Sequence, residues 1–562
     1  MAETGDGQRR QAAEPIITKL RFKKDAKGRP YGRYQGYKVL PCNKGRNCPH
    51  CQGNFDVSRF IDKKGSQRPD VLIFIDDLVR IPGQDPFYIA HKPAPNGISQ
   101  TERELSRIER IKTALGANIS TAQTPVSVVT CGGMPFRGGS CTAYWNHETD
   151  AILVVDYGRK VRALDPQDNE KKKRSEIGID ELPYEDFLVR NKEKIQAILI
   201  THQHLDHCGA LPYLPEELAD IPVYLTPFCY ATVESMCRNG DLPLPEVMRR
   251  FNPGQVVNYY FGEGEWEIEG FNVKSFPLLH STPETVGFDI RAGNRRILHF
   301  GDFNLAGVNK EDRKIQEQMF DNLIREGKID LVTFDAVGIG RPGRRPYEKK
   351  VDQDIGKIIA NAPGRVIIAV FASNVDRMKR LKKIAESMNR RVVYHGQAME
   401  MFFENAINLG YLEAQTAQVD PIDLLSGNKE VVFVTGGQAE PGAQLTRMAY
   451  SEPGAQITLR PTDTIILAQD PIPGNEKRIS KMIEHLKQDG YTVYTNRQDN
   501  LTTHVTGHCL ASDLEDILAK FARNTRLFMP QHMPRAGWES IQQTFPRYRM
   551  VVPRFRENTP LN

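Results

Sequence analysis

The amino-acid sequence predicts an α/β protein, and three observations support this fold class. Short apolar runs bounded by glycines begin near residue 124 and are typical of buried strands. After about residue 336, such runs alternate with helical patterns, which favours a mostly parallel sheet with helices on its faces. Several apolar runs end directly in histidine or aspartate, which indicates a site built from strand-end loops.

The first part of the chain differs in composition from the rest. Residues 1–70 contain 16 Lys and Arg against 7 Asp and Glu, a balance of +9, so the remainder of the +5 chain carries −4. A basic segment beside an acidic body is compatible with a polyanionic partner, and equally with a solvated tail. The segment shows few strand or helix signals, and a short helix is predicted over 101–116.

The bulk properties narrow the class of protein. The 562 residues are enough for about three or four domains. Nine cysteines are too few for a disulfide framework and favour a reducing, cytoplasmic setting. The polar start "MAETGDGQRR" lacks a signal-peptide pattern. The longest apolar run, 71–81, contains two aspartates and is too short to span a bilayer, so we expect no membrane partner.

The strands can be placed in order along the chain. The first part contains the runs "TPVSVVTCGG", "AILVVDYG", "IQAILI", "FNVKSFPLLH" and "RRILHFGDF". The second part contains "GRVIIAVF", "EVVFVTGG" and "DTIILAQDPIPG". A helix follows the first of these, because apolar residues recur at helical spacing from Val375 to Met388, with Ser373 placed to cap it.

The stretch "ILITHQHLDHCGALPYL", residues 198–214, places four ligand-type side chains after an apolar run: His202, His204, Asp206 and His207. Because alternate residues on a tight loop project to the same side, the first two can face one metal and the last two another. Imidazole nitrogens and carboxylate oxygens together suit Zn²⁺ or Mn²⁺. The alternative, a polar loop of exposed or hydrogen-bonded histidines, is disfavoured by this spacing.

Three further candidate ligands stand at comparable places. His280 ends "SFPLLH", Asp302 ends "ILHFGD", and His532 follows "LFMP". A single His or Asp at a strand end is more often structural. The ordered set nevertheless predicts a two-metal site, in which the two carboxylate oxygens of Asp302 could bridge the metals.

Dense motifs extend over roughly residues 124–550: "GIDELPYEDFLVRNKEKIQAILITHQHLDHCGALPYLP", "HSTPETVGF", "GDF", "FASNVDR", "GGQAEPGAQLTRMA", "DPIPGNE" and "HVTGH". In this order they resemble the metallo-β-lactamase fold, specifically its β-CASP nucleic-acid-processing branch, and most of all the ribonuclease J family. The resemblance implies an αββα sandwich with an inserted β-CASP α/β domain and an N-terminal extension. The implied parts are 1–123 (extension), 124–335 (metallo-β-lactamase domain, first part), 336–475 (β-CASP domain) and 476–562 (return segment).

The resemblance also implies ligand sets and β-CASP motifs. One zinc is held by His202, His204 and His280, the other by Asp206, His207 and His532, and Asp302 bridges them. Asp335 in "VTFDAVG" matches motif A, His508 in "HVTGH" matches motif B, and His532 matches motif C. A histidine in motif C resembles the RNA-acting members of the superfamily.

The implied activity is zinc-dependent 5′→3′ exonuclease cleavage of RNA, with endonuclease activity and use of Mn²⁺ left open. A hydroxide shared by two metals would attack phosphorus. The expected catalytic residues are Asp206, Asp335 and His508, of which His508 stabilises charge on the leaving 3′-oxygen. Contacts to the phosphates of single-stranded RNA, including a favoured 5′-monophosphate, are expected from Ser373, Asn374, His504, Thr506 and Gly507. Motif A reads "DAVG" where the family usually has "DSTN", so hydroxyls that would contact phosphate are missing.

The N-terminal extension contains the stretch "PCNKGRNCPHCQG" with Cys42, Cys48, His50 and Cys51. This turn resembles half of a zinc ribbon or knuckle, and the alternative is a group of reduced thiols. With its basic surroundings the extension is predicted to bind RNA or to dock a processing partner or a second copy of the chain.

Two other functions remain open at this point. A DNA nuclease of the same superfamily is disfavoured by His532. A catalytically silent RNA-binding scaffold is disfavoured by the complete set of seven metal ligands, which a scaffold would not need.

Overall fold

The structure is a computed structural model that describes residues 17–20, 23–24, 30–34, 37–41, 71–79, 87–91, 125–133, 139–160, 181–240, 265–413, 429–472, 474–533, 541, 543–551 and 559–561. The chain divides into two compact units, Met1–Ala122 and Gln123–Asn562. The predicted helix over 101–116 and the residues Cys42, Cys48, His50 and Cys51 lie outside the described residues.

The first unit contains a six-stranded sheet with the strand order β1-β5-β6-β4-β3-β2. Its strands are β1 (Ile17–Leu20), β2 (Lys23–Lys24), β3 (Pro30–Tyr34), β4 (Tyr37–Pro41), β5 (Val71–Val79) and β6 (Phe87–His91). The apolar run over 71–81 therefore forms a strand. Few strand signals precede it in the sequence, because β1 to β4 are short and all four carry lysine or arginine.

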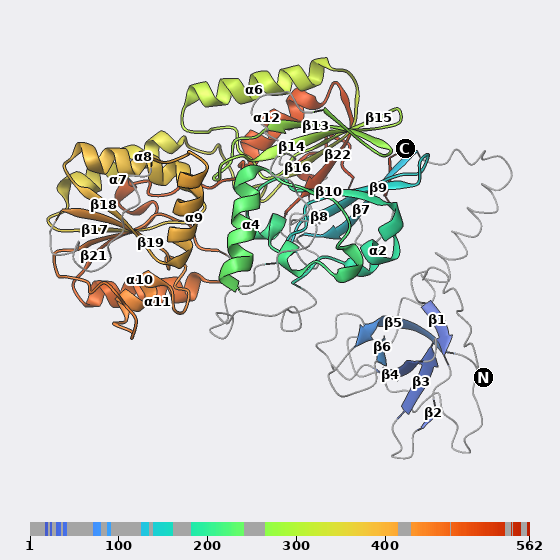
Figure 1. Cartoon of the computed structure of the whole chain (residues 1–562), viewed down its shortest axis with the longest axis horizontal. Helices are drawn as coiled ribbons and strands as arrows, with labels where there is room; N and C mark the ends of the chain where they lie inside the picture. The colour runs from blue at the N-terminus through green and yellow to red at the C-terminus, as the bar shows by residue number, and fades with distance from the viewer. Residues whose placement is uncertain are drawn as a thin grey trace. The chain divides into compact units, whose positions relative to one another are not determined.

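Two six-stranded mixed sheets form one lobe of the second unit, called the sandwich lobe here (Figure 1). The first has the order β11-β10-β9-β8-β7-β23 and the second β12-β13-β14-β15-β16-β22. The first comprises β7 (Val126–Gly132), β8 (Cys141–Asn146), β9 (Ala151–Val155), β10 (Ile195–Leu199), β11 (Val223–Tyr224) and β23 (Thr559–Pro560). The second comprises β12 (Glu265–Ile268), β13 (Phe271–Pro277), β14 (Val286–Ala292), β15 (Arg295–His299), β16 (Ile329–Asp335) and β22 (Thr525–Gln531).

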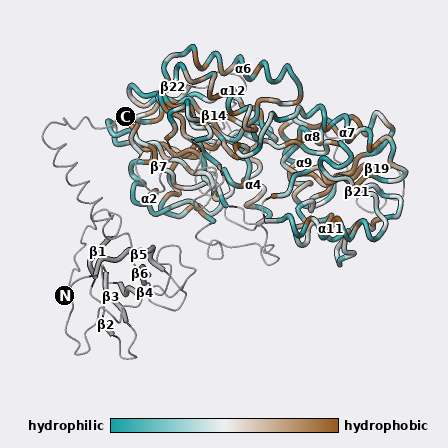
Figure 2. Tube along the Cα trace, turned by 180° about the vertical axis from the view of Figure 1, so that it is seen from behind, coloured by the Kyte–Doolittle hydropathy of each residue, from teal (hydrophilic) through white to brown (hydrophobic). Residues whose placement is uncertain are grey.

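Buried side chains show how these layers stack. Leu153 on β9 and Ile290 on β14 belong to one apolar cluster between the two sheets. The outer face of the first sheet packs against α2 (Glu185–Arg190), α3 (Leu205–Cys208) and α4 (Pro227–Gly240). The outer face of the second packs against α6 (Lys310–Arg325) and α12 (Ala511–Phe521). The predicted αββα sandwich is confirmed, and hydrophobic segments gather along its strands (Figure 2).

A second lobe, called the inserted lobe here, lies between β16 and α12 along the chain. Its sheet is parallel, with the order β18-β19-β17-β20-β21. The strands are β17 (Val366–Ala369), β18 (Arg391–His395), β19 (Glu430–Val434), β20 (Thr464–Leu467) and β21 (Thr492–Tyr494). One face is covered by α7 (Glu348–Asn361), α8 (Val375–Ser387) and α9 (Gln397–Asn408), the other by α10 (Gln444–Ala449) and α11 (Glu476–Gln488).

Two details differ from the sequence analysis. The inserted lobe extends beyond residue 475, because β21 pairs with β20 and α11 packs on the same sheet. The predicted cap of α8 was wrong by one residue. Asn374 is the N-cap, and its side chain accepts a hydrogen bond from the backbone of Arg377, so Ser373 is free for another role. Within the part of the chain that is described, no helix is both long and apolar enough to cross a membrane.

Candidate metal centre

All seven predicted ligands come together at one end of the sandwich lobe. Four lie just after a strand: His202 after β10, His280 after β13, Asp302 after β15 and His532 after β22. His204 is the N-cap of α3, and Asp206 and His207 lie on that short helix. Their ligand atoms form two groups, in each of which the atoms lie within 4.8 Å of one another. The groups are His202, His204, His280 with Asp302, and Asp206, His207, His532 with Asp302.

The loop that carries four of these residues is held by backbone hydrogen bonds. The amide of Ser140 donates to the carbonyl of Asp206 (2.7 Å), and the amide of Tyr157 donates to that of His207 (2.8 Å). Gly158 allows this close approach, since a Cβ there would lie only 1.8 Å from the Asp206 carbonyl oxygen. The loop is therefore fixed against its neighbours before any metal is considered.

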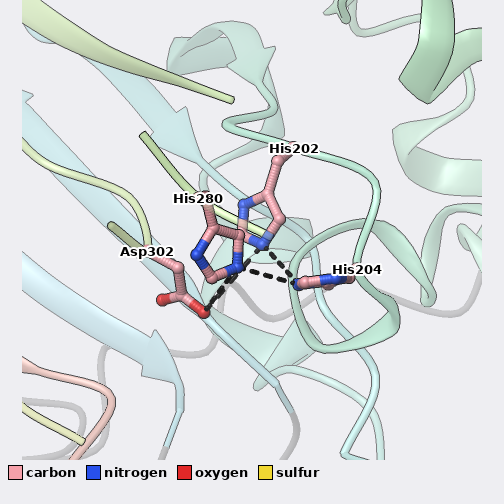
Figure 3. Close-up of side chains that lie close together, drawn as sticks. All are labelled: His202, His204, His280 and Asp302. Atoms are coloured by element: carbon pink, nitrogen blue, oxygen red, sulfur yellow. Dashed lines mark hydrogen bonds and ion pairs between the residues drawn. The ribbon is translucent and has the colours of Figure 1, made fainter. Parts of the chain in front are cut away.

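The first group points three imidazole nitrogens at one point (Figure 3). Nδ1 of His204 lies 3.1 Å from Nε2 of His202 and 3.1 Å from Nε2 of His280. Oδ2 of Asp302 lies 3.9 and 4.0 Å from those two Nε2 atoms. Zinc–nitrogen bonds of about 2.0–2.1 Å in a tetrahedral site put neighbouring nitrogens about 3.3 Å apart. The spacing observed fits such a site.

The second group mixes carboxylates with imidazoles. Nε2 of His532 lies 2.7 Å from Oδ2 of Asp206, and Nδ1 of the same ring lies 3.1 Å from Oδ1 of Asp302. Nε2 of His207 lies 3.3 Å from Oδ1 of Asp302. The two oxygens of Asp302 thus face different groups, which is the arrangement that a bridging ligand requires.

The two groups differ in their protonation. Burial lowers the pKa of His202 and His280 well below the usual range and that of His204 to about 4, so these imidazoles are neutral and free to bind a metal. Burial alone would also lower the pKa of His207 and His532, but the facing carboxylates outweigh it and raise both. Burial would raise the pKa of Asp302, whereas three facing histidines hold it well below its usual range.

In three of the ligand histidines the second ring nitrogen is also engaged, which fixes the orientation of those rings. Nδ1 of His207 lies 2.7 Å from Oδ2 of Asp156, and Nδ1 of His280 lies 3.0 Å from the carbonyl oxygen of Gly507. Nε2 of His204 lies 3.2 Å from Oγ of Ser373 in the inserted lobe. These partners leave the remaining nitrogen of each ring directed at the group.

Buried polar atoms without a hydrogen-bond partner test whether the residues fit a bound cation. Nε2 of His207 and Nδ1 of His532 are buried and lack a hydrogen-bond partner within the described residues. Buried polar atoms without partners are rare in proteins. Since both atoms face carboxylates in the second group, the donor set of nitrogen and oxygen fits zinc or manganese.

A third group adjoins the metal ligands. Nδ1 of His508 lies 2.6 Å from Oδ2 of Asp335, whose Oδ1 accepts a hydrogen bond from the amide of Val337. Burial would lower the pKa of His508, but Asp335 and Asp302 raise it. The structure thus brings the residues of motifs A and B into direct contact beside Asp302.

The predicted phosphate-binding residues divide into two sets. Ser373 contacts His204, and Thr506 and Gly507 lie in the segment that leads to His508. Asn374 is 4% exposed and caps α8, and His504 is 8% exposed and hydrogen-bonded within the inserted lobe. Their binding of RNA remains a prediction.

Asp156 is a site residue that was not predicted from the sequence. It orients His207 and also accepts hydrogen bonds from the amide and hydroxyl of Thr201. A signal was present, because Asp156 directly follows the apolar run 151–155 and β9 is the parallel neighbour of β10. Cys208 and Cys509, which follow motif histidines, are buried packing residues.

Comparison with known proteins matches both lobes. A model named "Ribonuclease J, beta-CASP domain" matches residues 363–486, and one named "Beta-lactamase superfamily domain" matches 182–331. Ribonuclease J 1 of Streptococcus pyogenes is 30% identical over 419 residues, covering 74% of this chain and 70% of its own. The chain belongs to the ribonuclease J family.

Two further relatives also carry the name ribonuclease J. Ribonuclease J of Mycolicibacterium smegmatis is 33% identical, covering 69% of this chain and 65% of its own, and that of Thermus thermophilus is 28% identical, covering 73% and 68%. A solved structure titled as a protein of unknown function from Enterococcus faecalis aligns with a TM-score of 0.55 at 17% identity, covering 77% of this chain and 99% of that one. This last likeness concerns the fold alone. The family and fold class predicted from the sequence are confirmed.

Proposed function

We propose that this member of the ribonuclease J family is a zinc-dependent 5′→3′ exoribonuclease that acts on single-stranded RNA, favours a 5′-monophosphate and has endonuclease cleavage as a second mode. The observation that carries the proposal is the pair of complete ligand groups that share Asp302, with His508 and Asp335 directly beside them. The names of the relatives support RNA as the substrate.

Two bound zinc ions would supply activated water at neutral pH and neutralise phosphate charge. His202, His204 and His280 would hold one ion and Asp206, His207 and His532 the other, with Asp302 shared. Manganese suits the same mixed donor set.

The protein's own groups would handle the leaving oxygen and the phosphate. His508 is oriented by Asp335 through the 2.6 Å contact, which also stabilises the protonated ring. The ring would stabilise charge, or give its proton, at the leaving 3′-oxygen. Ser373, beside His204, would place a phosphate oxygen at the edge of the first group. Asp206 contributes by holding His532.

The experiment uses purified full-length protein and matched RNA and DNA oligomers with a 5′-monophosphate, 5′-triphosphate or 5′-hydroxyl. Chelator treatment and the variant Asp302→Asn are the controls. Metal-dependent release of nucleotides from 5′-monophosphate RNA supports the proposal. Cleavage of DNA in its place would support a DNA nuclease, and binding of RNA without cleavage would support a scaffold.

Cytoplasmic location and the docking role of the N-terminal unit belong to the same proposal. A tagged chain should co-sediment with the cytosolic fraction of its own cells. Removal of residues 1–122 should weaken RNA binding or partner capture and leave zinc binding at the centre intact. Zinc content of the separate unit would test Cys42, Cys48, His50 and Cys51.

A further inference from the structure

The segment 502–508 joins the two lobes and reaches the metal ligands. Its last residue is His508, and the carbonyl oxygen of Gly507 contacts Nδ1 of His280 (3.0 Å) and accepts a hydrogen bond from Nδ2 of Asn304 (3.1 Å). Gly507 has no room for a side chain, since a Cβ would lie 2.8 Å from Cε1 of His280. The position of this segment therefore decides how His280 and His508 are oriented.

Two buried arginines donate hydrogen bonds to the backbone of this segment. Nη2 of Arg377 donates to the carbonyl of Val505 (3.0 Å), and Nε of Arg345 donates to the carbonyl of Thr506. Arg377 is fully buried, and Arg345 is 5% exposed. Successive carbonyls of the segment are thus anchored by guanidinium groups, whose hydrogen bonds are charge-assisted and stronger than neutral ones.

A single carboxylate orients both arginines. Glu348, at the start of α7, accepts hydrogen bonds from Nη2 of Arg345 (2.8 Å) and from Nε and Nη2 of Arg377 (2.9 and 2.7 Å). It also accepts one from Nη2 of Arg380 (2.8 Å). With four such bonds the carboxylate is fully paired, so the cluster needs no ligand of its own.

The same network also contacts His504. Nη1 of Arg377 lies 2.8 Å from Nδ1 of that ring, and a guanidinium can only donate. The same nitrogen also lies 3.1 Å from the carbonyl oxygen of Ala468. Burial and the charge of Arg377 lower the pKa of His504 to about 3. The ring is therefore neutral near pH 7.

We propose that Glu348, Arg345 and Arg377 are positioning residues for the metal centre. They hold segment 502–508 so that the Gly507 carbonyl orients His280 and the backbone presents His508 to Asp335. None of the three touches a metal ligand or the reacting phosphate. Their effect passes through the backbone of the segment, and zinc affinity reports it independently of RNA cleavage.

A merely structural role would give a different result, and the chain offers a matched control. Arg365 is also buried (1% exposed), and it donates to a carboxylate, Asp463, and to a backbone carbonyl, that of Thr458. It lies in the same lobe but makes no contact with segment 502–508 among the hydrogen bonds of the described residues. Loss of Arg365 should therefore lower the folding stability as loss of Arg345 does, and leave the metal centre undisturbed.

The test compares Arg345→Met with Arg365→Met in the full-length protein. Zinc affinity is measured by competition with a chromogenic chelator. The values of kcat and KM, and their pH profiles, are measured on a 5′-monophosphate RNA oligomer. Partners that orient metal ligands typically contribute about 10–100-fold to metal affinity. We expect a loss in that range, and a fall in kcat larger than the rise in KM, for Arg345→Met only. Arg345→Lys should recover part of both.

If the arginine variants do not fold, the milder pair Glu348→Gln and Asp463→Asn is compared in their place. These two substitutions preserve the shape of the side chain. Here too the zinc affinity should fall for the first variant alone. Equal zinc affinity in the two members of either folded pair would overturn the inference. A wild-type protein that binds zinc but cleaves no RNA would contradict the proposed function, and the zinc comparison would still decide the inference.

Discussion

The metal centre and the Glu348 network are both buried clusters of opposite charges, but they differ in how fully they are paired. Four hydrogen bonds from guanidinium groups satisfy the Glu348 carboxylate. In the metal centre, Nε2 of His207 and Nδ1 of His532 have no hydrogen-bond partner among the described residues. The three imidazoles of the first group, moreover, turn bare nitrogens toward one another.

This difference separates a structural cluster from a binding site. Leaving a buried polar group unpaired costs about 1–3 kcal/mol, so a fold keeps such groups only where something else offsets the cost. A bound cation would do so in the metal centre. In the Glu348 network every charge already has its partner, which suits a rigid support.

The largest effect is expected at the shared ligand. Asp302→Asn places an amide between the two groups and removes the negative charge that both face. Activity on RNA should fall by at least about a thousandfold, the upper range for loss of one group that stabilises transition-state charge. Metal content and kcat are measured together, with Asp289→Asn, a buried aspartate paired with Arg296, as the control. Two bound metals and near-normal activity would refute the bridging role.

The next effect concerns the leaving group. His508→Ala removes the ring that Asp335 orients, and a positioned acid or base contributes about 100–10,000-fold. We expect kcat to fall by about a hundredfold or more while zinc stoichiometry stays at the wild-type value. Loss of a zinc ion in this variant would instead make His508 a metal ligand.

The Glu348 network predicts a pH dependence of stability. Burial alone would raise the pKa of Glu348, but its arginines lower it from 4.5 to about 2. A depressed pKa stabilises the folded state fully above about pH 4.5, and the contribution is lost as the pH falls toward 2. The shift corresponds to about 3 kcal/mol. The free energy of unfolding of wild type minus Glu348→Gln should therefore be largest at pH 5–7 and shrink toward pH 3. A difference in unfolding free energy that does not vary with pH would contradict this prediction.

The smallest effect is expected at the contact between the lobes. Ser373→Ala removes the 3.2 Å partner of Nε2 of His204, so zinc affinity should fall by about tenfold, the low end for such partners. Ser387→Ala is the control, because among the described residues that hydroxyl donates only to the carbonyl of Ile384, in the last turn of α8. If zinc affinity is unchanged in Ser373→Ala while KM for RNA rises, Ser373 serves the phosphate and not the histidine.

Much of the site could be predicted because its chemistry is local in sequence. Each ligand directly follows an apolar run, and strands of adjacent sheets end at the same edge. The positioning residues could not be found in this way. Glu348 begins a helix in a charged stretch, and its partners are Arg345 nearby and Arg377 on the next helix. In the sequence these are ordinary surface-type residues, and only packing shows that they are buried.

The sequence by itself determined the fold class, the family and the residues that gather at the metal centre, because strand periodicity and ligand spacing are properties of neighbouring residues. Only the tertiary structure decided which nitrogen of each ring faces the centre, that Asp156 and Gly507 orient the rings, and that Asn374 in place of Ser373 caps α8. These outcomes depend on backbone and side-chain groups brought together from distant positions, and no local pattern encodes such contacts.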